Sequence, residues 1–350
     1  MKNTKNFLVN ISITIIALLF LFLFCEISVR GVMFYKSKNN FKEVMNNLPE
    51  VRDECFAAII QPSMNPKIIY ELRPNINVHF LKGLVKTNNM GCRSNEDYLF
   101  NKDSNAVRIL GLGDSYMFGQ GVDQDKNLLD VLEIELNKKF TQKKWKIINA
   151  AVPGYNTVME VETLREKYLK YKPDIVIIEF IGNDFQLPNF IYDTADWKDF
   201  KRSFFIEFLM KKCALLPNNF QLFGAPANFK LGWGFEDDAS RVPEQYKDIV
   251  GWDSYARAMK ALKKMQKEYG FDVISFLTLG YKDDRVFNLS RQLGFYTTYN
   301  DAYDSKDLSL VISKNDIHPS ELGHKKNAEK LLNFIIKEGI IEKHINNKKW

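Results

Sequence analysis

Four short segments of this chain carry residue types that perform acyl transfer in proteins. Ser115 follows Gly113 and Asp114 in GLGDSYMFGQG, where small neighbours would let its hydroxyl and backbone N–H face a ligand. His318 lies in NDIHPSELGH, two residues after Asp316. A serine nucleophile needs a base to take its proton, and the base needs a third group to hold its tautomer. These types predict Ser115 as nucleophile, His318 as base and Asp316 as acid.

Two further segments could donate hydrogen bonds to an oxyanion. Gly154 lies in AAVPGYN, and without a side chain its backbone N–H can approach a negatively charged oxygen closely. Asn183 lies in GND and offers an amide N–H. Each of the four segments alone is more often an ordinary turn or surface loop. Their occurrence in one chain, in the order Ser, Gly, Asn and His, favours a catalytic site.

The sequence around these segments predicts a sheet that brings them together. Apolar runs alternate with amphipathic stretches, which predicts a parallel sheet covered by helices in three α/β/α layers. Ligands bind such sheets beyond the carboxyl ends of the strands. The first three strands end just before Ser115, Gly154 and Asn183. We expect strands over 107–113, 145–152, 174–181, 271–279 and 295–299, and helices over 127–140, 158–171, 254–268 and 320–337.

We expect the catalytic domain to cover residues 106–345. Within it, residues 185–252 are rich in aromatic residues and punctuated by Pro and Gly, and they are too long for an ordinary connection. They indicate an insertion beside the site, whose aromatic residues either form its core or line an acyl or sugar pocket. Residues 31–105 are polar with little periodicity, which predicts a stalk or irregular extension without chemistry of its own.

The N-terminus contains an uncharged run of 19 residues, 7–25. As a helix it would span about 28 Å, close to the roughly 30 Å hydrocarbon core, and it is longer than the apolar region of a signal peptide. We therefore predict one transmembrane helix as a membrane anchor within residues 1–30, with a cleaved signal peptide as the alternative. The tail before it is short and no second apolar span follows, so we expect the catalytic domain outside the cytoplasm.

The composition is that of a globular protein. Of 350 residues, 45% are hydrophobic and 26% are charged, and 49 Lys and Arg against 43 Asp and Glu leave a net charge of +6. This modest, interspersed excess predicts no nucleic acid partner. Four cysteines without a zinc pattern and four histidines without HExxH predict no metal, while disulfide pairing stays open. No cofactor is predicted, because the glycine pattern GxGxxG fails at Tyr116.

The four segments resemble the ordered blocks of the SGNH or GDSL hydrolases. The resemblance covers about residues 87–340, including TNNMGCR, which is similar to a stretch that often precedes the core in membrane-anchored bacterial members. It implies a flavodoxin-like fold, Ser115 as nucleophile and His318 as base. It also implies an oxyanion hole made by the N–H groups of Ser115 and Gly154 and the amide of Asn183.

The acid is the point where this chain departs from many members. A spacing of Asp-x-x-His would place Asn315 in the acid's position, whereas other members use Asp-x-His, which selects Asp316. We expect Asp316 to be the acid, with a Ser-His dyad as the alternative.

The resemblance implies a serine esterase that acts on O-acylated envelope glycans or lipids. Water resolving the acyl-enzyme gives an esterase, and a sugar hydroxyl gives an O-acyltransferase; the motifs do not decide between them. A catalytically silent, membrane-tethered module that binds a glycan or a partner is the alternative from another functional class.

Overall fold

The structure, a computed structural model, describes residues 2–46, 56–63, 65, 67–192, 203–213, 229–231, 242, 244–278 and 283–346. The chain forms two compact units. The N-terminal unit joins Met1–Leu48 with Tyr192–Lys230, and the α/β unit joins Pro49–Ile191 with Leu231–Trp350.

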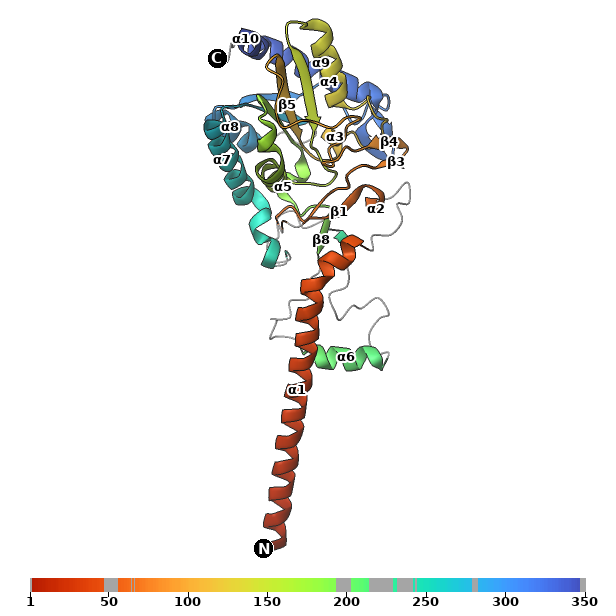
Figure 1. The fold of residues 1–350 in the computed structure, drawn as a ribbon, viewed down its shortest axis with the longest axis vertical. Helices are drawn as coiled ribbons and strands as arrows, with labels where there is room; N and C mark the ends of the chain where they lie inside the picture. Colours follow the sequence, from red (N-terminus) through yellow and green to blue (C-terminus); the bar gives the residue numbers. More distant parts are fainter. Residues whose placement is uncertain are drawn as a thin grey trace. The chain divides into compact units, whose positions relative to one another are not determined.

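A five-stranded parallel sheet forms the centre of the α/β unit (Figure 1). Its strands are β5 (Ala106–Leu112), β6 (Lys144–Asn149), β7 (Ile175–Phe180), β10 (Asp272–Thr278) and β11 (Tyr296–Asn300). They lie in the order β11-β10-β7-β5-β6. The chain therefore runs from β5 to the edge strand β6, crosses back to β7 and continues to the other edge. This is the flavodoxin-like order, and the predicted α/β fold is confirmed.

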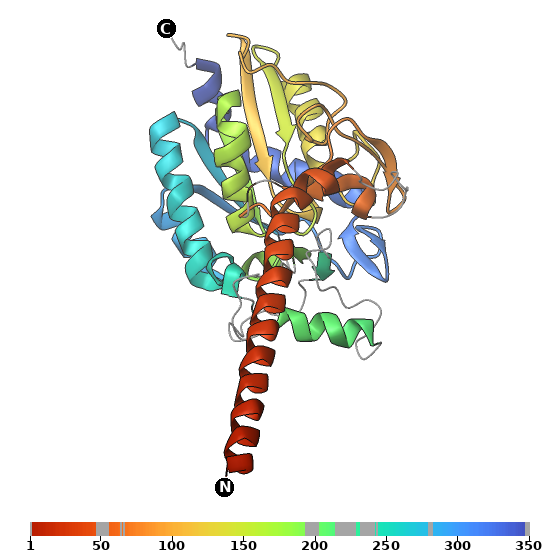
Figure 2. The ribbon, with the colours of Figure 1, turned by 60° about the horizontal axis from the view of Figure 1, so that its bottom comes forward.

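Helices cover both faces of this sheet. α4 (Leu128–Lys139) packs against α9 (Glu321–Lys337), and α5 (Thr157–Thr163) packs against α7 (Gly251–Tyr269). Figures 1 and 2 place the two pairs on opposite faces. The remaining elements of the α/β unit include α8 (Asp284–Gln292), α10 (Ile340–Asn346), a π turn (Leu164–Tyr168) and 3₁₀ turns (Leu169–Tyr171, Glu244–Ile249). The short strands β8 (Phe190–Tyr192) and β9 (Phe229–Leu231) include the positions at which the chain passes from one unit to the other.

Capping side chains fix the start of two helices close to the site. Asn156 caps α5 and Ser320 caps α9, each accepting the backbone N–H three residues further on. Such a cap satisfies a donor that has no partner inside the helix and stabilises by about 1 kcal/mol. Gly154 and His318 each lie two residues before one of these caps. The caps therefore also fix the positions at which the loops carrying Gly154 and His318 end.

Two of the three inner strands, β7 and β10, are buried along their whole length. Helices cover both faces of these strands, so their sequences are largely apolar without alternation. Cys92 lies in this core. Cys25, Cys92 and Cys213 are free thiols, and Cys55 lies outside the described residues.

The described part of residues 56–105 is folded onto the α/β unit, unlike the stalk that we expected over 31–105. α2 (Phe56–Ile59) leads into a hairpin-like pair, β1 (Ile60–Pro62) with β2 (Tyr70–Leu72), and β3 (Asn77–Phe80) pairs with β4 (Gly83–Lys86). Tyr70 and Phe80 are fully buried. These strands have only three or four residues each, too few for their alternation to be recognised in the sequence. We call residues 56–105 the extension.

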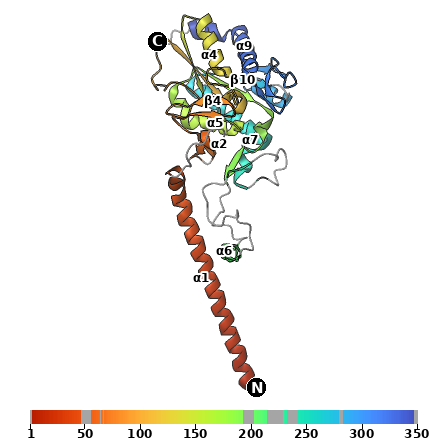
Figure 3. The same ribbon diagram turned by 90° about the vertical axis from the view of Figure 1, so that its right-hand side faces the viewer.

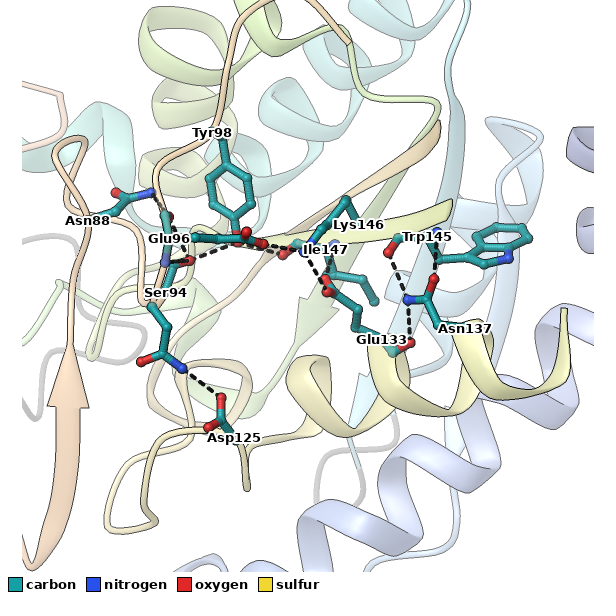
Figure 4. A network of polar contacts seen from close by, with 11 residues as sticks. Asn88, Ser94, Glu96, Tyr98, Asp125, Glu133, Asn137, Trp145, Lys146 and Ile147 are labelled. Atoms are coloured by element: carbon teal, nitrogen blue, oxygen red, sulfur yellow. Dashed lines mark hydrogen bonds and ion pairs between the residues drawn. The ribbon is translucent and has the colours of Figure 1, made fainter. Parts of the chain in front are cut away.

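Side chains form hydrogen bonds with backbone groups along the outer edge of β6, an edge strand of the sheet (Figure 4). Asn137 of α4 accepts the backbone N–H of Trp145 at 3.0 Å and donates to its carbonyl at 2.8 Å. Glu133 accepts the N–H of Ile147, and the Tyr98 hydroxyl of the extension donates to the Ile147 carbonyl at 3.0 Å. An edge strand otherwise leaves such groups open to pairing with other chains. Here α4 and the extension occupy the place of a further strand.

The N-terminal unit contains α1 (Lys2–Asn46) and α6 (Phe204–Lys212). The segment Val9–Val32 of α1 is long and apolar enough to cross a membrane, and its side chains are almost all exposed. Its length and composition fit a membrane anchor and a signal sequence alike. α6 comes from the expected insertion at 185–252 and lies beside α1 (Figure 3).

Candidate active site

Two of the expected site residues, Ser115 and Asn183, follow the strands between which the sheet order reverses. β5 and β7 are neighbours, while the chain between them visits β6 on the far side of β5. Open α/β sheets bind ligands at such a switch point, beyond the carboxyl ends of the strands. Ser115 begins the short helix α3 (Ser115–Phe118) after β5, and Asn183 lies in the 3₁₀ turn Gly182–Phe185 after β7.

The turn that carries Ser115 is shaped by the two residues before it. A Cβ at Gly113 would lie 2.5 Å from the Cβ of Met117, so a larger residue would displace the helix. Asp114 caps α3, because its carboxylate accepts the N–H of Tyr116 at 3.0 Å. Ser115 is therefore held at the first position of α3, with 8% of its surface exposed.

Ser115, His318 and Asp316 form one chain of hydrogen bonds. The Ser115 Oγ lies 2.8 Å from His318 Nε2, and His318 Nδ1 lies 2.6 Å from Asp316 Oδ1. Asp316 also accepts the backbone N–H of His318 at 3.1 Å. The hydrogen bond from His318 lowers the pKa of Asp316, against the opposing effect of burial. Asn315, which the other spacing would place in the acid's position, donates its backbone N–H to the Ser313 hydroxyl at the end of β12 (Val311–Ser313).

The histidine segment is held by the hairpin β12 (Val311–Ser313) and β13 (Asp316–Pro319) and by two tyrosines. Tyr116 and Tyr303 both donate their hydroxyls to the carbonyl of Ile317. The Tyr116 ring lies 5.0 Å from the ring of His318. Gln120 adds its amide nitrogen 3.3 Å from both ring nitrogens of His318. The imidazole is thus fixed on several sides.

Asn183 is connected to the nucleophile through Asp114. The Asn183 amide nitrogen donates to Asp114 Oδ2 at 3.0 Å, and the Ser115 hydroxyl lies 3.3 Å from the same oxygen. One N–H of the amide is directed at Asp114, which leaves the second for a ligand. Asp114 therefore orients the residues on either side of the switch point, a role that the sequence analysis did not assign.

Gly154 adopts a backbone conformation that excludes other residues. Its φ is +77°, and a Cβ there would lie 2.1 Å from the Asn189 side chain. The N–H of Val152 donates to the Gly113 carbonyl at 3.0 Å, and the N–H of Asn189 donates to the Gly154 carbonyl at 3.0 Å. Gly154 is therefore tied to the loop that carries Ser115 and to the segment that follows Asn183.

Four carboxyl groups are buried together behind these loops: Asp114, Glu160, Glu179 and Asp184. Burial raises the pKa of all four, and the charges of the neighbouring carboxyl groups add to the rise at Glu160, Glu179 and Asp184. The pKa of Asp184 rises to about 8. Hydrogen bonds from the Tyr116 N–H and the Asn183 amide, both at 3.0 Å, oppose this rise at Asp114, and hydrogen bonds from the Thr157 hydroxyl and the Ile181 N–H oppose it at Asp184. The described residues contain no cluster of His, Cys, Asp and Glu suited to a metal ion.

Arg93 of the extension holds the loop after Ser115 from behind. Its guanidinium donates to the carbonyls of Phe118 and Gly119, at 2.9 and 2.5 Å, and to that of Val122 at 2.7 Å. It is 1% exposed, and burial lowers its pKa to about 10. Arg93 ends the TNNMGCR stretch noted in the sequence, but nothing in the sequence indicated these contacts.

Tyr70 of the extension holds the glycine loop in a similar way. Its hydroxyl donates to the Pro153 carbonyl at 2.9 Å, and the Tyr155 hydroxyl donates to the Tyr70 carbonyl. The two rings pack edge to face with centroids 5.3 Å apart. This contact could not be predicted from the sequence, because a tyrosine in a polar stretch has many ordinary explanations.

The sheet order and the hydrogen-bonded serine, histidine and aspartate are the arrangement found in serine hydrolases with an α/β fold. Residues 112–326 match the sequence model of the GDSL-like lipase/acylhydrolase family. This match covers more than half of the chain, and the chain belongs to that family.

Solved structures that are similar to this chain include those of TesA and of a mutant of Axe2. TesA is 13% identical, with a TM-score of 0.40, over 65% of this chain and 97% of TesA. A catalytic mutant of Axe2, an acetylxylan esterase from Geobacillus stearothermophilus, is 15% identical, with a TM-score of 0.41, over 65% of this chain and 94% of Axe2.

An uncharacterized protein of Mycoplasma pneumoniae is 30% identical over 101 residues, or 28% of this chain. The matched segment spans only 12% of that protein's length.

Proposed function

We propose that this protein is a serine esterase that cleaves ester bonds through an acyl-enzyme on Ser115. The observation that carries the proposal is the chain of hydrogen bonds from Ser115 to His318 at 2.8 Å and from His318 to Asp316 at 2.6 Å. A hydroxyl in reach of an imidazole that a carboxylate orients is the arrangement that activates a weak nucleophile.

In the proposed reaction, Ser115 Oγ attacks the ester carbonyl while His318 Nε2 takes the hydroxyl proton. Asp316 accepts the hydrogen bond from Nδ1, which fixes the tautomer with a free Nε2 and stabilises the imidazolium. His318 then returns the proton to the leaving alcohol. In the second half, His318 takes a proton from water, the hydroxide oxygen attacks the acyl group, and Ser115 leaves with that proton.

The developing oxyanion would be stabilised by the backbone N–H groups of Ser115 and Gly154 and by the second N–H of the Asn183 amide. Each such donor contributes about 3 kcal/mol of transition-state stabilisation in known hydrolases. The hydrogen bond from Asn183 to Asp114 supports this assignment, since it fixes the amide before substrate binds.

The proposed substrate is an O-acylated glycan or lipid of the cell envelope. We infer this from the apolar helix within α1, which we propose to be an uncleaved membrane anchor through residues 7–25 that places the α/β unit outside the cytoplasm. Hydrolysis and transfer share every step up to the acyl-enzyme, so they differ only in whether water or a sugar hydroxyl resolves it.

Hydrolysis of p-nitrophenyl esters of short and long acids by the full-length protein in detergent tests the proposal. We expect Ser115→Ala to lower kcat on the order of 10⁴-fold or more, with the melting temperature unchanged. Unchanged hydrolysis in Ser115→Ala would refute the proposal. Adding a saccharide acceptor and measuring acylated sugar against free acid separates transfer from hydrolysis.

A further inference from the structure

The N-terminal unit contains a contact that neither the catalytic site nor a simple anchor requires. Glu26 of α1 accepts hydrogen bonds from the first backbone N–H groups of α6, Phe204 at 3.2 Å and Phe205 at 2.9 Å. It also accepts the Ser203 hydroxyl at 2.9 Å and pairs with Arg30 at 2.8 Å. Glu26 is thus the N-terminal cap of α6, supplied by another helix.

The contacts around Glu26 fix the position of α6 along the axis of α1. Phe22 packs edge to face on Phe205 with ring centroids 5.8 Å apart, and the Arg30 guanidinium lies 4.7 Å from the centre of the Phe204 ring. Positions 22–30 of α1 therefore hold the start of α6. They lie at the end of the uncharged run of residues 7–25, where a helix that began crossing at residue 7 has risen about 28 Å and leaves the hydrocarbon.

α6 exposes two large apolar side chains to its surroundings. Phe204 is fully buried against α1, while Ile206 and Leu209, one turn apart, are 45% and 44% exposed. Lys212 follows at the C-terminal end and is exposed. An apolar side with a cationic end is the pattern of helices that lie in the boundary between headgroups and acyl chains.

We propose that α6 is a membrane-surface helix that lies in the interfacial layer of the bilayer crossed by α1, with Ile206 and Leu209 against lipid. The inference rests on the membrane anchorage proposed above. Figure 1 shows α6 extending sideways from α1, and Figure 3 shows it end-on beside α1, as expected for a helix in the membrane plane next to one that crosses the membrane. Glu26 is tolerated at this level because α6 and Arg30 satisfy both its oxygens.

The test measures lipid contact at single sites in the full chain reconstituted in vesicles. Cys25, Cys55 and Cys213 are replaced by serine, while Cys92 is buried and stays. A fluorophore is attached through Ile206→Cys or Leu209→Cys, and phospholipids with nitroxides near the headgroup or deep in the chain quench it. Two matched controls use exposed apolar residues, Leu19→Cys in α1 (62% exposed) and Ile134→Cys in α4 (54% exposed).

We expect the shallow nitroxide to quench the probes at 206 and 209 several times more than the probe at 134, and the deep nitroxide to quench best at 19. Glu26→Ala, which removes the cap, should reduce quenching at 206. Probes at 206 and 209 that behave like the probe at 134 would overturn the proposal. Probes shielded from both nitroxides and a water-soluble quencher would also overturn it, since protein would then cover α6.

Two further measurements distinguish a failure of the α6 proposal from a failure of the anchor proposal or of the esterase proposal. A probe at 19 without deep quenching would refute the anchor itself. Reaction of Ser115 with a fluorophosphonate, measured on the same vesicles, reports on the esterase proposal alone.

Discussion

The strand-end loops and the extension contribute to the same candidate site by different means. Ser115, His318 and Asn183 are joined to the site by hydrogen bonds between side chains, whereas Arg93 and Tyr70 bind backbone carbonyls of the loops. In the proposed function the first group supplies the chemistry and the second fixes its geometry. A displacement of about 1 Å in such a site costs up to about 10²-fold in rate, so the second group should matter almost as much as the first.

The largest effect in this comparison should come from a side chain that faces the substrate. Asn183→Ala removes an oxyanion donor and should lower kcat about 10²- to 10³-fold with little change in KM. Steady-state kinetics with a p-nitrophenyl ester measures this. Asn183→Asp is the matched control, because it keeps the size but cannot donate, and it should be as slow. Normal kcat in both variants would remove Asn183 from the site.

A residue of the extension should come next. Arg93→Met removes the buried guanidinium that donates to several backbone carbonyls, so we expect a stability loss of about 3 kcal/mol and a fall in kcat of up to about 10²-fold at temperatures where the protein is folded. Arg108→Met is the matched control, since Arg108 is also buried and binds backbone carbonyls, but at the opposite end of β5.

Arg108→Met should lose stability and keep its kcat. Equal losses of kcat in the two arginine variants would show that Arg93 acts only through stability. Partial recovery of kcat in Arg93→Lys would support positioning by the donated hydrogen bonds.

A smaller effect is expected from one hydroxyl. Tyr70→Phe removes the hydrogen bond to Pro153 and should lower kcat about tenfold or less, with a stability loss of about 1 kcal/mol. Tyr98→Phe removes a similar bond to Ile147 at the sheet edge and should change stability alone. If both tyrosine variants show the same kcat, the extension does not position the glycine loop.

The last prediction concerns stability as a function of pH and not the rate of the reaction. Burial raises the pKa of Asp184 to about 8, against about 3.9 in an unfolded chain, so the folded state binds the extra proton. Its contribution is complete below about pH 4 and is lost as the pH rises through about 8. With Asp184→Asn, the melting temperature should therefore decrease less between about pH 4 and pH 8 than it does in the unchanged protein.

Asp272 is the control of opposite sign for this measurement. Although burial favours its neutral form, hydrogen bonds from His344 and Lys343 lower its pKa, so its contribution is present at neutral pH and is lost as the pH falls. A decline in melting temperature that is unchanged by Asp184→Asn would contradict the assigned pKa.

The strands and most helices of the sheet could be predicted because their patterns are long and local. The expected strand at 174–181 corresponds to β7 (Ile175–Phe180), and the expected helix at 320–337 to α9 (Glu321–Lys337). α8 was not predicted, because it is short and buries few of its own residues, among them Val286 and Ser290.

The candidate side chains could also be named from the sequence, because serine, histidine and aspartate in ordered short segments indicate their chemistry. The residues that hold these side chains in place could not be predicted from the sequence. Arg93 and Val122 are 29 positions apart, and Tyr70 and Pro153 are 83 apart. Such pairs join a side chain to a backbone carbonyl, and every residue has a carbonyl, so no residue type marks the partner.

The central claim is that Ser115 is a nucleophile activated by His318. The most direct measurement treats the full-length protein with a fluorophosphonate and locates the adduct by peptide mass spectrometry. We predict one adduct, on Ser115, that is absent in Ser115→Ala and forms far more slowly in His318→Ala although both variants remain folded. An adduct on another residue, or none on a folded protein, would contradict the account.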